Sequence, residues 1–175
     1  MLLLYHLFMD QITDLNKKKL IVGWFSFTCS EDSTILLTEL LNDHLDEWKK
    51  VVEFRHFKAL KAKNSLTNLD VAFIEGAISS ETQAKEAQRI RDNAKYVVAI
   101  GACACTGLPS ASRNQFTDEQ INERIKWYMS NFNFNQKVKK LGDVIKIDDM
   151  VQGCPMNAAI FTQILEKYLK LFEIL

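Results

Sequence analysis

The stretch "KYVVAIGACACTGLPS" (95–110) runs from an apolar segment directly into two cysteines flanked by glycines. Near-continuous Val, Ile and Ala residues are typical of a strand that is covered on both faces, as in a parallel sheet. Four other short apolar runs also have strand character: "LIVGWFSF" (20–27), "VVEFRHF" (51–57), "LDVAFIEG" (69–76) and "DVIKID" (143–148). The sequence therefore predicts five strands.

Segments with helical character separate these strands, at residues 33–48, 79–93, 117–129 and 156–175. Two of them open with a possible capping box, Ser80 with Gln83 and Thr117 with Gln120. Strands that alternate with helices form parallel sheets with right-handed crossovers. We therefore expect an α/β fold with a flavodoxin-like doubly wound parallel sheet, in which strands 1, 3, 4 and 5 are neighbours.

The composition indicates one globular domain. The chain has 175 residues, 47% of them hydrophobic, which is enough for a core without disulfides. Its 22 basic residues balance 22 acidic ones, so no basic excess indicates nucleic-acid binding. We expect one flavodoxin-like domain over residues 19–175 and an N-terminal extension over residues 1–18.

The apolar start "MLLLYHLFM" (1–9) lacks the basic region and cleavage site of a secretory signal. It is also far too short to span a bilayer. We therefore expect a cytoplasmic protein with no direct membrane span, whose translation starts at Met1 or Met9.

All four cysteines follow the carboxyl end of a predicted strand. Cys29 follows the first strand, Cys103 and Cys105 the fourth, and Cys154 the fifth, while Glu75 ends the third. Ligands of open α/β sheets bind outside the carboxyl ends of the strands. The thiols should therefore meet at one crevice.

Several kinds of chemistry fit four such thiols. Cysteines can be inert core residues, or they can hold zinc, although only "CAC" is a closely spaced pair here. A nucleophilic cysteine would need an imidazole base, and His6, His44 and His56 all lie outside the thiol-bearing loops. Thiolates on loops also hold iron–sulfur clusters. Glycine near the thiols in "GACACTG" (101–107) and "QGCP" (152–155) lets backbone approach a bulky ligand.

These motifs together resemble the small subunit of nickel–iron hydrogenases. The resemblance rests on a strand that ends in Cys29, then "DVAFIEGAI" (70–78), "VVAIGACACTGLPS" (97–110) and "GCPMN" (153–157), and it covers residues 19–170. It is closest to the short cytoplasmic type found in bidirectional and sulfhydrogenase-like complexes. The related small subunit of complex I is less similar, because it carries adjacent cysteines at its first motif.

The resemblance implies an oxidoreductase subunit that holds one proximal 4Fe–4S cluster at the carboxyl ends of the strands. Cys29, Cys103 and Cys154 match three of the family's cluster ligands. Glu75 matches the glutamate of an E-G motif beside the cluster, where it would have a supporting or proton-control role, although it could equally be a solvated strand-end residue. No residue of this chain is expected to be catalytic.

The fourth ligand has two candidates. Asp32 stands where the family has the second cysteine of C-x-x-C, three positions after Cys29. It precedes a predicted helix, so its carboxylate could also be an N-cap. Cys105 is an additional thiol two residues after Cys103. We favour Asp32 because it occupies the family position.

The sequence therefore predicts an electron-transfer subunit. Electrons would pass between a nickel–iron centre in a separate large subunit and a further flavin- or iron–sulfur-bearing subunit. No cysteine follows Cys154, so we expect a proximal cluster alone. The alternatives are a quinone-reductase cluster subunit of the complex I type and a zinc-stabilised binding module without redox activity.

Overall fold

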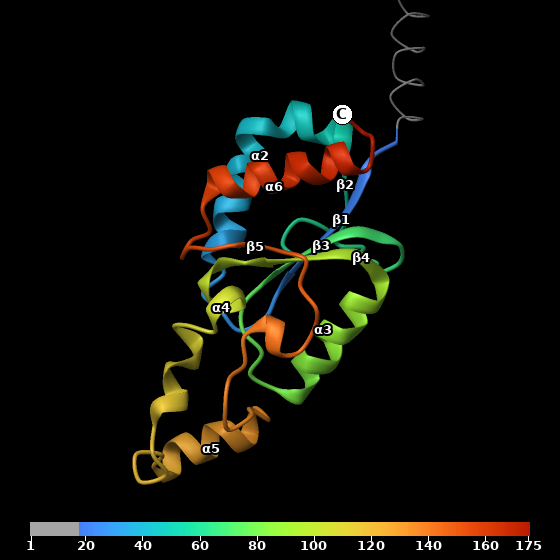
Figure 1. Cartoon of the computed structure of the whole chain (residues 1–175). Helices are drawn as coiled ribbons and strands as arrows, with labels where there is room; N and C mark the ends of the chain where they lie inside the picture. Colours follow the sequence, from blue (N-terminus) through green and yellow to red (C-terminus); the bar gives the residue numbers. More distant parts are fainter. Residues whose placement is uncertain (1–17) are drawn as a thin grey trace, which may run out of the picture.

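Five parallel strands form one sheet in the order β2-β1-β3-β4-β5 (Figure 1). The computed structural model describes residues 18–175, so almost all of the predicted N-terminal extension lies outside the described residues. The order is the flavodoxin-like one, and the predicted fold class is confirmed. The strands are β1 (Leu20–Ser26), β2 (Val52–Phe57), β3 (Leu69–Glu75), β4 (Ala94–Ile100) and β5 (Asp149–Val151).

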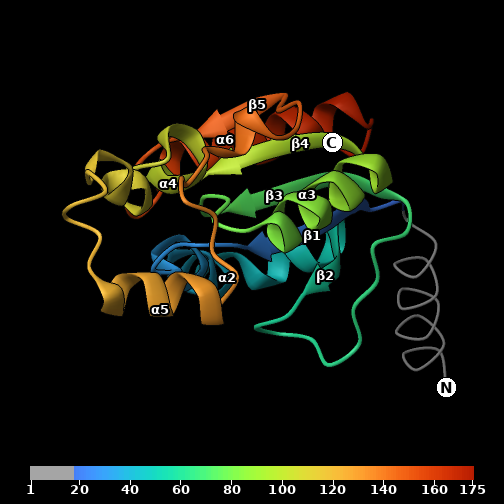
Figure 2. The same ribbon diagram turned by 90° about the horizontal axis from the view of Figure 1, so that it is seen from below.

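Helices cover both faces of the sheet. In Figures 1 and 2, α2 and α6 lie on one face, and α3 lies on the other. Parallel strands need such crossover helices, and both faces of the sheet are then buried. The helices are α2 (Asp32–Val51), α3 (Glu81–Asn93), α4 (Gly101–Thr106), α5 (Glu123–Asn131) and α6 (Ala158–Leu171), with 3₁₀ turns η1 (Ser110–Gln115) and η2 (Leu141–Asp143).

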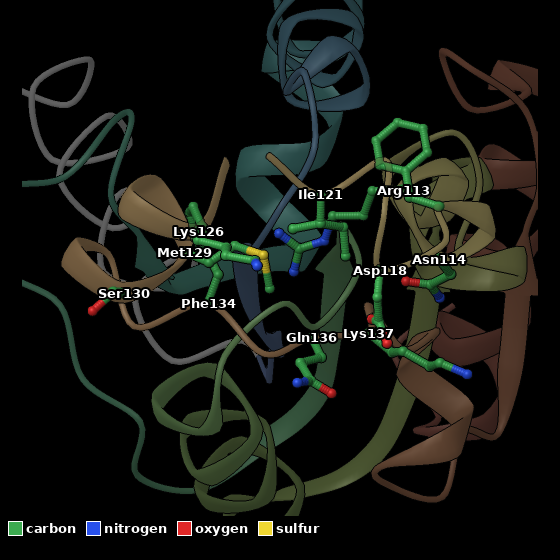
Figure 3. Close-up of a pocket in the computed structure, with 11 residues that line it drawn as sticks. Arg113, Asn114, Asp118, Ile121, Lys126, Met129, Ser130, Phe134, Gln136 and Lys137 are labelled. Atoms are coloured by element: carbon green, nitrogen blue, oxygen red, sulfur yellow. The ribbon is translucent and has the colours of Figure 1, made fainter. Parts of the chain in front are cut away.

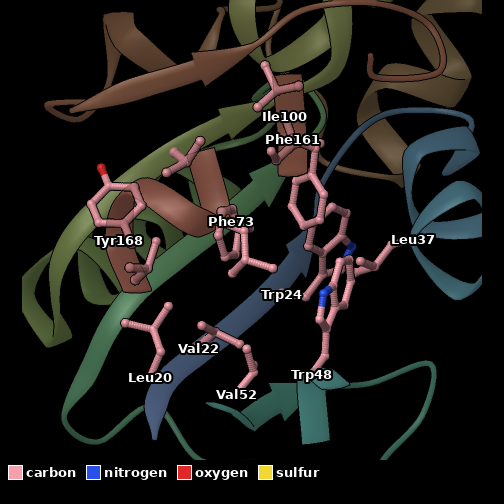
Figure 4. Packing of buried hydrophobic residues seen from close by; sticks show 14 of the residues in the cluster. Leu20, Val22, Trp24, Leu37, Trp48, Val52, Phe73, Ile100, Phe161 and Tyr168 are labelled. Atoms are coloured by element: carbon pink, nitrogen blue, oxygen red, sulfur yellow. The ribbon is translucent and has the colours of Figure 1, made fainter. Parts of the chain in front are cut away.

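Aromatic side chains fill the core under α2 and α6 (Figure 4). The Trp24 ring lies 6.0 Å from Phe73 and 6.0 Å from Phe161, which it meets edge-on. Such tilted and edge-on pairs add to the stabilisation that comes from buried area. The central strand β3 is buried along its whole length, so packing on both faces holds its last residue, Glu75, in place.

The fifth strand lies later in the chain than the sequence predicts. The apolar pattern predicts an extended segment at 143–148, but η2 and the turn after it occupy the first half of this range, and β5 spans Asp149–Val151. Ile145 is buried under the sheet from the turn, so its apolar character reflects core packing and not strand pairing. The Asp148 carboxylate accepts a hydrogen bond from Val97 N at 2.8 Å, immediately before β5 pairs with β4.

The helix predicted at 117–129 also begins later. Gln120 Oε1 does accept from Thr117 N at 2.9 Å, which is half of the expected capping box. The chain nevertheless makes only a turn there, and α5 begins after Asn122, whose side chain caps Ile125 N at 3.0 Å. The other predicted box also forms by half: the Ser80 side chain accepts from Gln83 N, while Gln83 Oε1 accepts from Ser79 N and not from Ser80 N.

Residues 108–137, which we call the arm, leave the domain beyond the carboxyl edge of the sheet (Figures 1 and 2). The arm carries η1 and α5. The chain that returns from the arm is fixed to the domain by backbone hydrogen bonds. Asn135 N donates to Ser79 O at 2.7 Å, and just after the arm Lys139 pairs with Ile78 in an antiparallel β-bridge. Between residues 18 and 175, no helix is both long and apolar enough to cross a membrane.

Candidate functional site

The carboxyl ends of β1, β3, β4 and β5 surround one small hollow. Its lining includes every favoured site residue of the sequence: Cys29, Asp32, Glu75, Cys103 and Cys154. Strand order brings them together, because the loops after these neighbouring strands leave the sheet at the same edge. Three of the four thiols therefore meet, as their positions after the strands predict.

The fourth thiol, Cys105, lies elsewhere. Its Sγ contacts the carbonyl oxygens of Ala99 at 3.6 Å and Val151 at 3.7 Å inside the core. Side chains two positions apart on a helix point about 200° away from each other, so α4 turns Cys103 to the hollow and Cys105 to the core. Burial raises the pKa of Cys105 to about 11, as expected for a thiol surrounded by apolar groups.

Asp32 is the first residue of α2 and faces Cys154. Its Oδ2 lies 3.5 Å from Cys154 Sγ, and this hydrogen bond raises the pKa of the Cys154 thiol. The alternative in which Asp32 is the N-cap is wrong. Glu31 occupies the cap position in a left-handed conformation (φ 62°), and no side chain of the cap residue bonds the helix.

Glu75 does the capping instead, from a neighbouring strand. Its carboxylate accepts hydrogen bonds from Ser33 N at 3.0 Å, Thr34 N at 3.2 Å and Thr34 Oγ1 at 2.8 Å. The two backbone N–H groups are among those that the first turn of a helix leaves without partners. Glu75 is only 3% exposed, so it is not a solvated strand-end residue. The side chain ties the start of α2 to the end of β3.

Ser33 joins three of the loops, and the sequence analysis missed it. Its N–H donates to Glu75, and its Oγ accepts from Met156 N at 3.2 Å, in the loop of Cys154. A Cβ on Gly101, two residues before Cys103, would lie only 3.1 Å from the Ser33 Oγ. The sequence feature that could have pointed to Ser33 is its position as a small polar residue next to Asp32, at the start of a predicted helix.

The loops of Cys103 and Cys154 also bond to each other. Ala102 N donates to Gly153 O at 2.7 Å, and Gly153 has a positive φ of 120° that favours glycine. Cys103 Sγ lies 3.2 Å from Ser110 Oγ, which in turn donates to Thr28 O at 3.1 Å, next to Cys29. The thiols are therefore held by a connected polar network.

Burial is the main electrostatic influence on Cys29. It raises the pKa of the thiol to about 12, and the nearby carboxylates of Glu75 and Glu31 act in the same direction. A backbone hydrogen bond at Glu31 opposes the rise. The thiol is protonated at neutral pH in the metal-free chain, so a metal centre that binds it must displace a proton.

These residues fit an iron–sulfur cluster better than a single metal ion. Within residues 18–175, no three His, Cys, Asp or Glu side chains converge closely enough to hold one ion. Three thiols and a carboxylate instead surround a hollow whose lining also includes Gly101 and Gly153. Sulfur ligands set by separate loops around a bulky core are typical of such clusters.

Residues 29–168 match the family described as NADH ubiquinone oxidoreductase, 20 Kd subunit. The chain belongs to this family. The matched range contains all five of the site residues that line the hollow, from Cys29 to Cys154. The predicted resemblance to hydrogenase and complex I small subunits is confirmed at the level of the family, which is one of oxidoreductase subunits.

Several hydrogenase subunits are similar to this family member. One belongs to the F420-non-reducing hydrogenase of Methanothermobacter marburgensis and is 28% identical over 63% of this chain and 40% of its own length. Another is the delta subunit of the NAD-reducing hydrogenase HoxS of Cupriavidus necator, 24% identical over 62% of this chain and 63% of its own. The chain thus spans less than two thirds of either relative.

Solved structures confirm the fold. A chain of an NAD+-reducing [NiFe]-hydrogenase in the H2-reduced state superposes with a TM-score of 0.71 at 20% identity, over 87% of this chain and 93% of that chain. The Ni-Fe-Se hydrogenase of Desulfomicrobium baculatum matches with a TM-score of 0.57 at 16% identity, over 88% of this chain and 64% of that chain.

Proposed function

We propose that this chain is the electron-transfer small subunit of a cytoplasmic nickel–iron hydrogenase, with one proximal 4Fe–4S cluster. One observation carries the proposal: Cys29, Cys103 and Cys154 line one hollow at the carboxyl edge of the sheet, together with Asp32. Membership of an oxidoreductase subunit family supports it. The partners in this proposal are a large subunit with the nickel–iron centre and a flavin- or iron–sulfur-bearing subunit.

When bound, a 4Fe–4S cluster supplies a one-electron carrier. The thiolates of Cys29, Cys103 and Cys154 would hold three of its corners and the Asp32 carboxylate the fourth. Glu75 would hold the start of α2, and therefore Asp32, in place through its hydrogen bonds to Ser33 and Thr34. Conversion of H2 to protons and electrons would take place in the large subunit.

Metal analysis tests this proposal. Anaerobically purified protein should contain about four iron and four sulfide per chain. Replacement of Cys103 by Ser should lower the iron content, while replacement of the core residue Cys105 by Ser should not. Stoichiometric zinc without iron would instead support the zinc-stabilised module and contradict the proposal.

A quinone-reductase cluster subunit of the complex I type is the second candidate, because the description of the matched family names NADH ubiquinone oxidoreductase. Both candidates predict the same cluster. The purified complex distinguishes them: with H2 as the only donor, a hydrogenase reduces the cluster and a quinone reductase does not.

A further inference from the structure

The Ser110 hydroxyl contacts one of the thiols that line the hollow. Its Oγ lies 3.2 Å from Cys103 Sγ, in a part-buried position at the start of η1. Among the described residues 18–175, the other two thiols of the hollow have no hydroxyl partner. Cys29 Sγ lies 3.8 Å from a backbone carbonyl oxygen, and Cys154 Sγ lies 3.5 Å from a carboxylate oxygen. Cys103 is therefore the one candidate ligand with a hydroxyl group beside its sulfur.

In the metal-free chain, this hydroxyl uses its hydrogen elsewhere. Ser110 Oγ donates to Thr28 O at 3.1 Å, so the contact with sulfur forms with the Cys103 S–H group as the donor. Thr28 O also accepts a hydrogen bond from Ala77 N at 2.9 Å. The carbonyl group therefore keeps a partner if the Ser110 hydrogen turns away, and no acceptor is left unsatisfied.

Iron binding removes the hydrogen from the sulfur. A cysteine binds a metal centre as the thiolate, so Cys103 must release its proton to solvent when it becomes a ligand. A thiolate sulfur can only accept hydrogen bonds, whereas a serine hydroxyl can both donate and accept. The 3.2 Å contact then holds only if the Ser110 hydroxyl turns from Thr28 O to Cys103 Sγ. Rotation about the Cβ–Oγ bond is enough, because Ser110 Oγ already lies within hydrogen-bond distance of both acceptors.

We propose that Ser110 donates a hydrogen bond to Cys103 Sγ in the cluster-bound protein and thereby raises the reduction potential of the cluster. This inference rests on the proposed function. Reduction adds one electron, which increases the negative charge on the sulfur ligands. A donor to sulfur therefore stabilises the reduced cluster more than the oxidised one, and hydrogen bonds to the sulfurs are among the factors that set the potential. Ser110 is not an iron ligand in this proposal, because it acts through Cys103.

The turn that carries Ser110 is fixed by two polar side chains of η1, Arg113 and Asn114, which also line a pocket in the arm (Figure 3). Arg113 Nη2 donates to Asn135 O at 2.7 Å. The Asn114 side chain exchanges two hydrogen bonds with the backbone of Val138, both at 2.8 Å. A hydroxyl on a fixed turn keeps its distance to the sulfur in both redox states, as a constant influence on the potential requires.

Redox titration of matched variants tests the proposal. Ser110→Ala removes the donor and should lower the reduction potential, whereas Ser110→Thr keeps a hydroxyl and should restore the potential towards the wild-type value. Ser112→Ala is the control and should leave the potential unchanged. Ser112 lies in the same turn but is exposed, and its side chain makes no hydrogen bond within residues 18–175. A purely structural role of Ser110 would instead lower the iron content and leave the potential of the remaining cluster unchanged, which would contradict the proposal.

Pulsed electron paramagnetic resonance detects the hydrogen itself. After exchange into D2O and reduction with dithionite, the paramagnetic cluster should couple to the deuteron of the Ser110 hydroxyl. The coupling should be present in the wild type and in Ser110→Thr, and it should be absent from Ser110→Ala. Exchangeable backbone N–H groups contribute equally in all three proteins, so the difference between their spectra isolates the hydroxyl.

Two results would overturn the inference. One is an unchanged potential in a Ser110→Ala protein that retains its iron, and the other is a wild-type cluster with no coupled exchangeable deuteron. The second measurement needs no variant, so it decides the question even if Ser110→Ala loses the cluster. Iron analysis of the same samples separates this inference from the proposed function. A wild type without iron contradicts both, whereas about four irons per chain with an unshifted potential contradict only the role of Ser110.

Discussion

The sequence alone could not show which carboxylate caps α2 and which faces the cysteines. In the structure, Glu75 caps the helix and Asp32 faces Cys154. A carboxylate just before a helix is usually an N-cap, yet the cap of α2 comes from Glu75, a residue 43 positions away from Asp32 at the end of β3. The helix therefore has no need of the Asp32 carboxylate, which faces Cys154 at 3.5 Å. This division supports the proposal that Asp32 is the fourth ligand.

At the residue scale, we predict that Asp32 binds the cluster and Cys105 does not. Asp32→Cys should retain about four irons and shift the reduction potential, because a carboxylate is a harder and more weakly bound ligand than thiolate. Asp32→Ala should lower the iron content. Cys105→Ser should change neither quantity, since its Sγ is in the core. Iron analysis and redox titration measure both effects.

The matched comparison is decisive for this prediction. If Cys105→Ser loses the cluster and Asp32→Ala keeps it with an unchanged potential, Asp32 has no ligand role. Loss of iron in both variants would show instead that the site tolerates no change nearby, and circular dichroism would then separate unfolding from loss of a ligand.

At the scale of elements, the sequence predicted those strands and helices whose apolar pattern reflects their own packing. β1, β3 and β4 are buried runs and were placed nearly to the residue. The pattern failed at 143–148, where Ile145 packs into the core from a turn, and at 117–129, where α5 buries nothing. Neither hydrophobic periodicity nor a capping motif indicates which backbone N–H groups of a helix will hydrogen-bond to a side chain on a distant strand. The cap from Glu75 and the hydrogen bond of Ser33 to Met156 N were invisible for the same reason.

Asp148 shows how a side chain positions β5, and its pH dependence tests this. Burial alone would raise the pKa of Asp148, but hydrogen bonds from Val97 N and Arg91, together with the charge of Arg91, outweigh it and lower the pKa. A lowered pKa in the folded state stabilises the fold above the unfolded-state pKa of about 4, and this contribution is lost as pH falls through the folded value.

We therefore predict that Asp148→Asn lowers the free energy of unfolding by about 1–3 kcal/mol at pH 7. The difference from the wild type should shrink as the pH falls below about 4. Urea unfolding at both pH values measures it. Asp143→Asn is the control: its carboxylate lies 3.9 Å from Lys140 and is half-exposed, so the change should stay below about 0.5 kcal/mol. An Asp148 effect that does not vary with pH would exclude the ionic explanation.

At the scale of the whole molecule, the domain and the arm differ in how they are stabilised. The sheet is packed on both faces, whereas the arm ends in exposed aromatic rings on a chain with zero formal charge. Proteins near zero net charge that expose apolar surface tend to associate. The isolated chain should therefore be prone to aggregation through the arm, although its core is complete.

We predict that Trp127→Ser combined with Phe132→Ser raises the solubility of the chain expressed without partners and leaves its melting temperature within a few degrees, about the effect of surface changes. The reason is that neither ring is buried, so the fold loses no core packing. Size-exclusion chromatography and thermal unfolding measure the two quantities.

Trp24→Ser is the opposite control, because Trp24 is 2% exposed among Phe57, Phe73 and Phe161 and its loss should unfold the domain. If the arm variant also melts far below the wild type, the arm is part of the cooperative core, and its aromatic surface is not free for a partner.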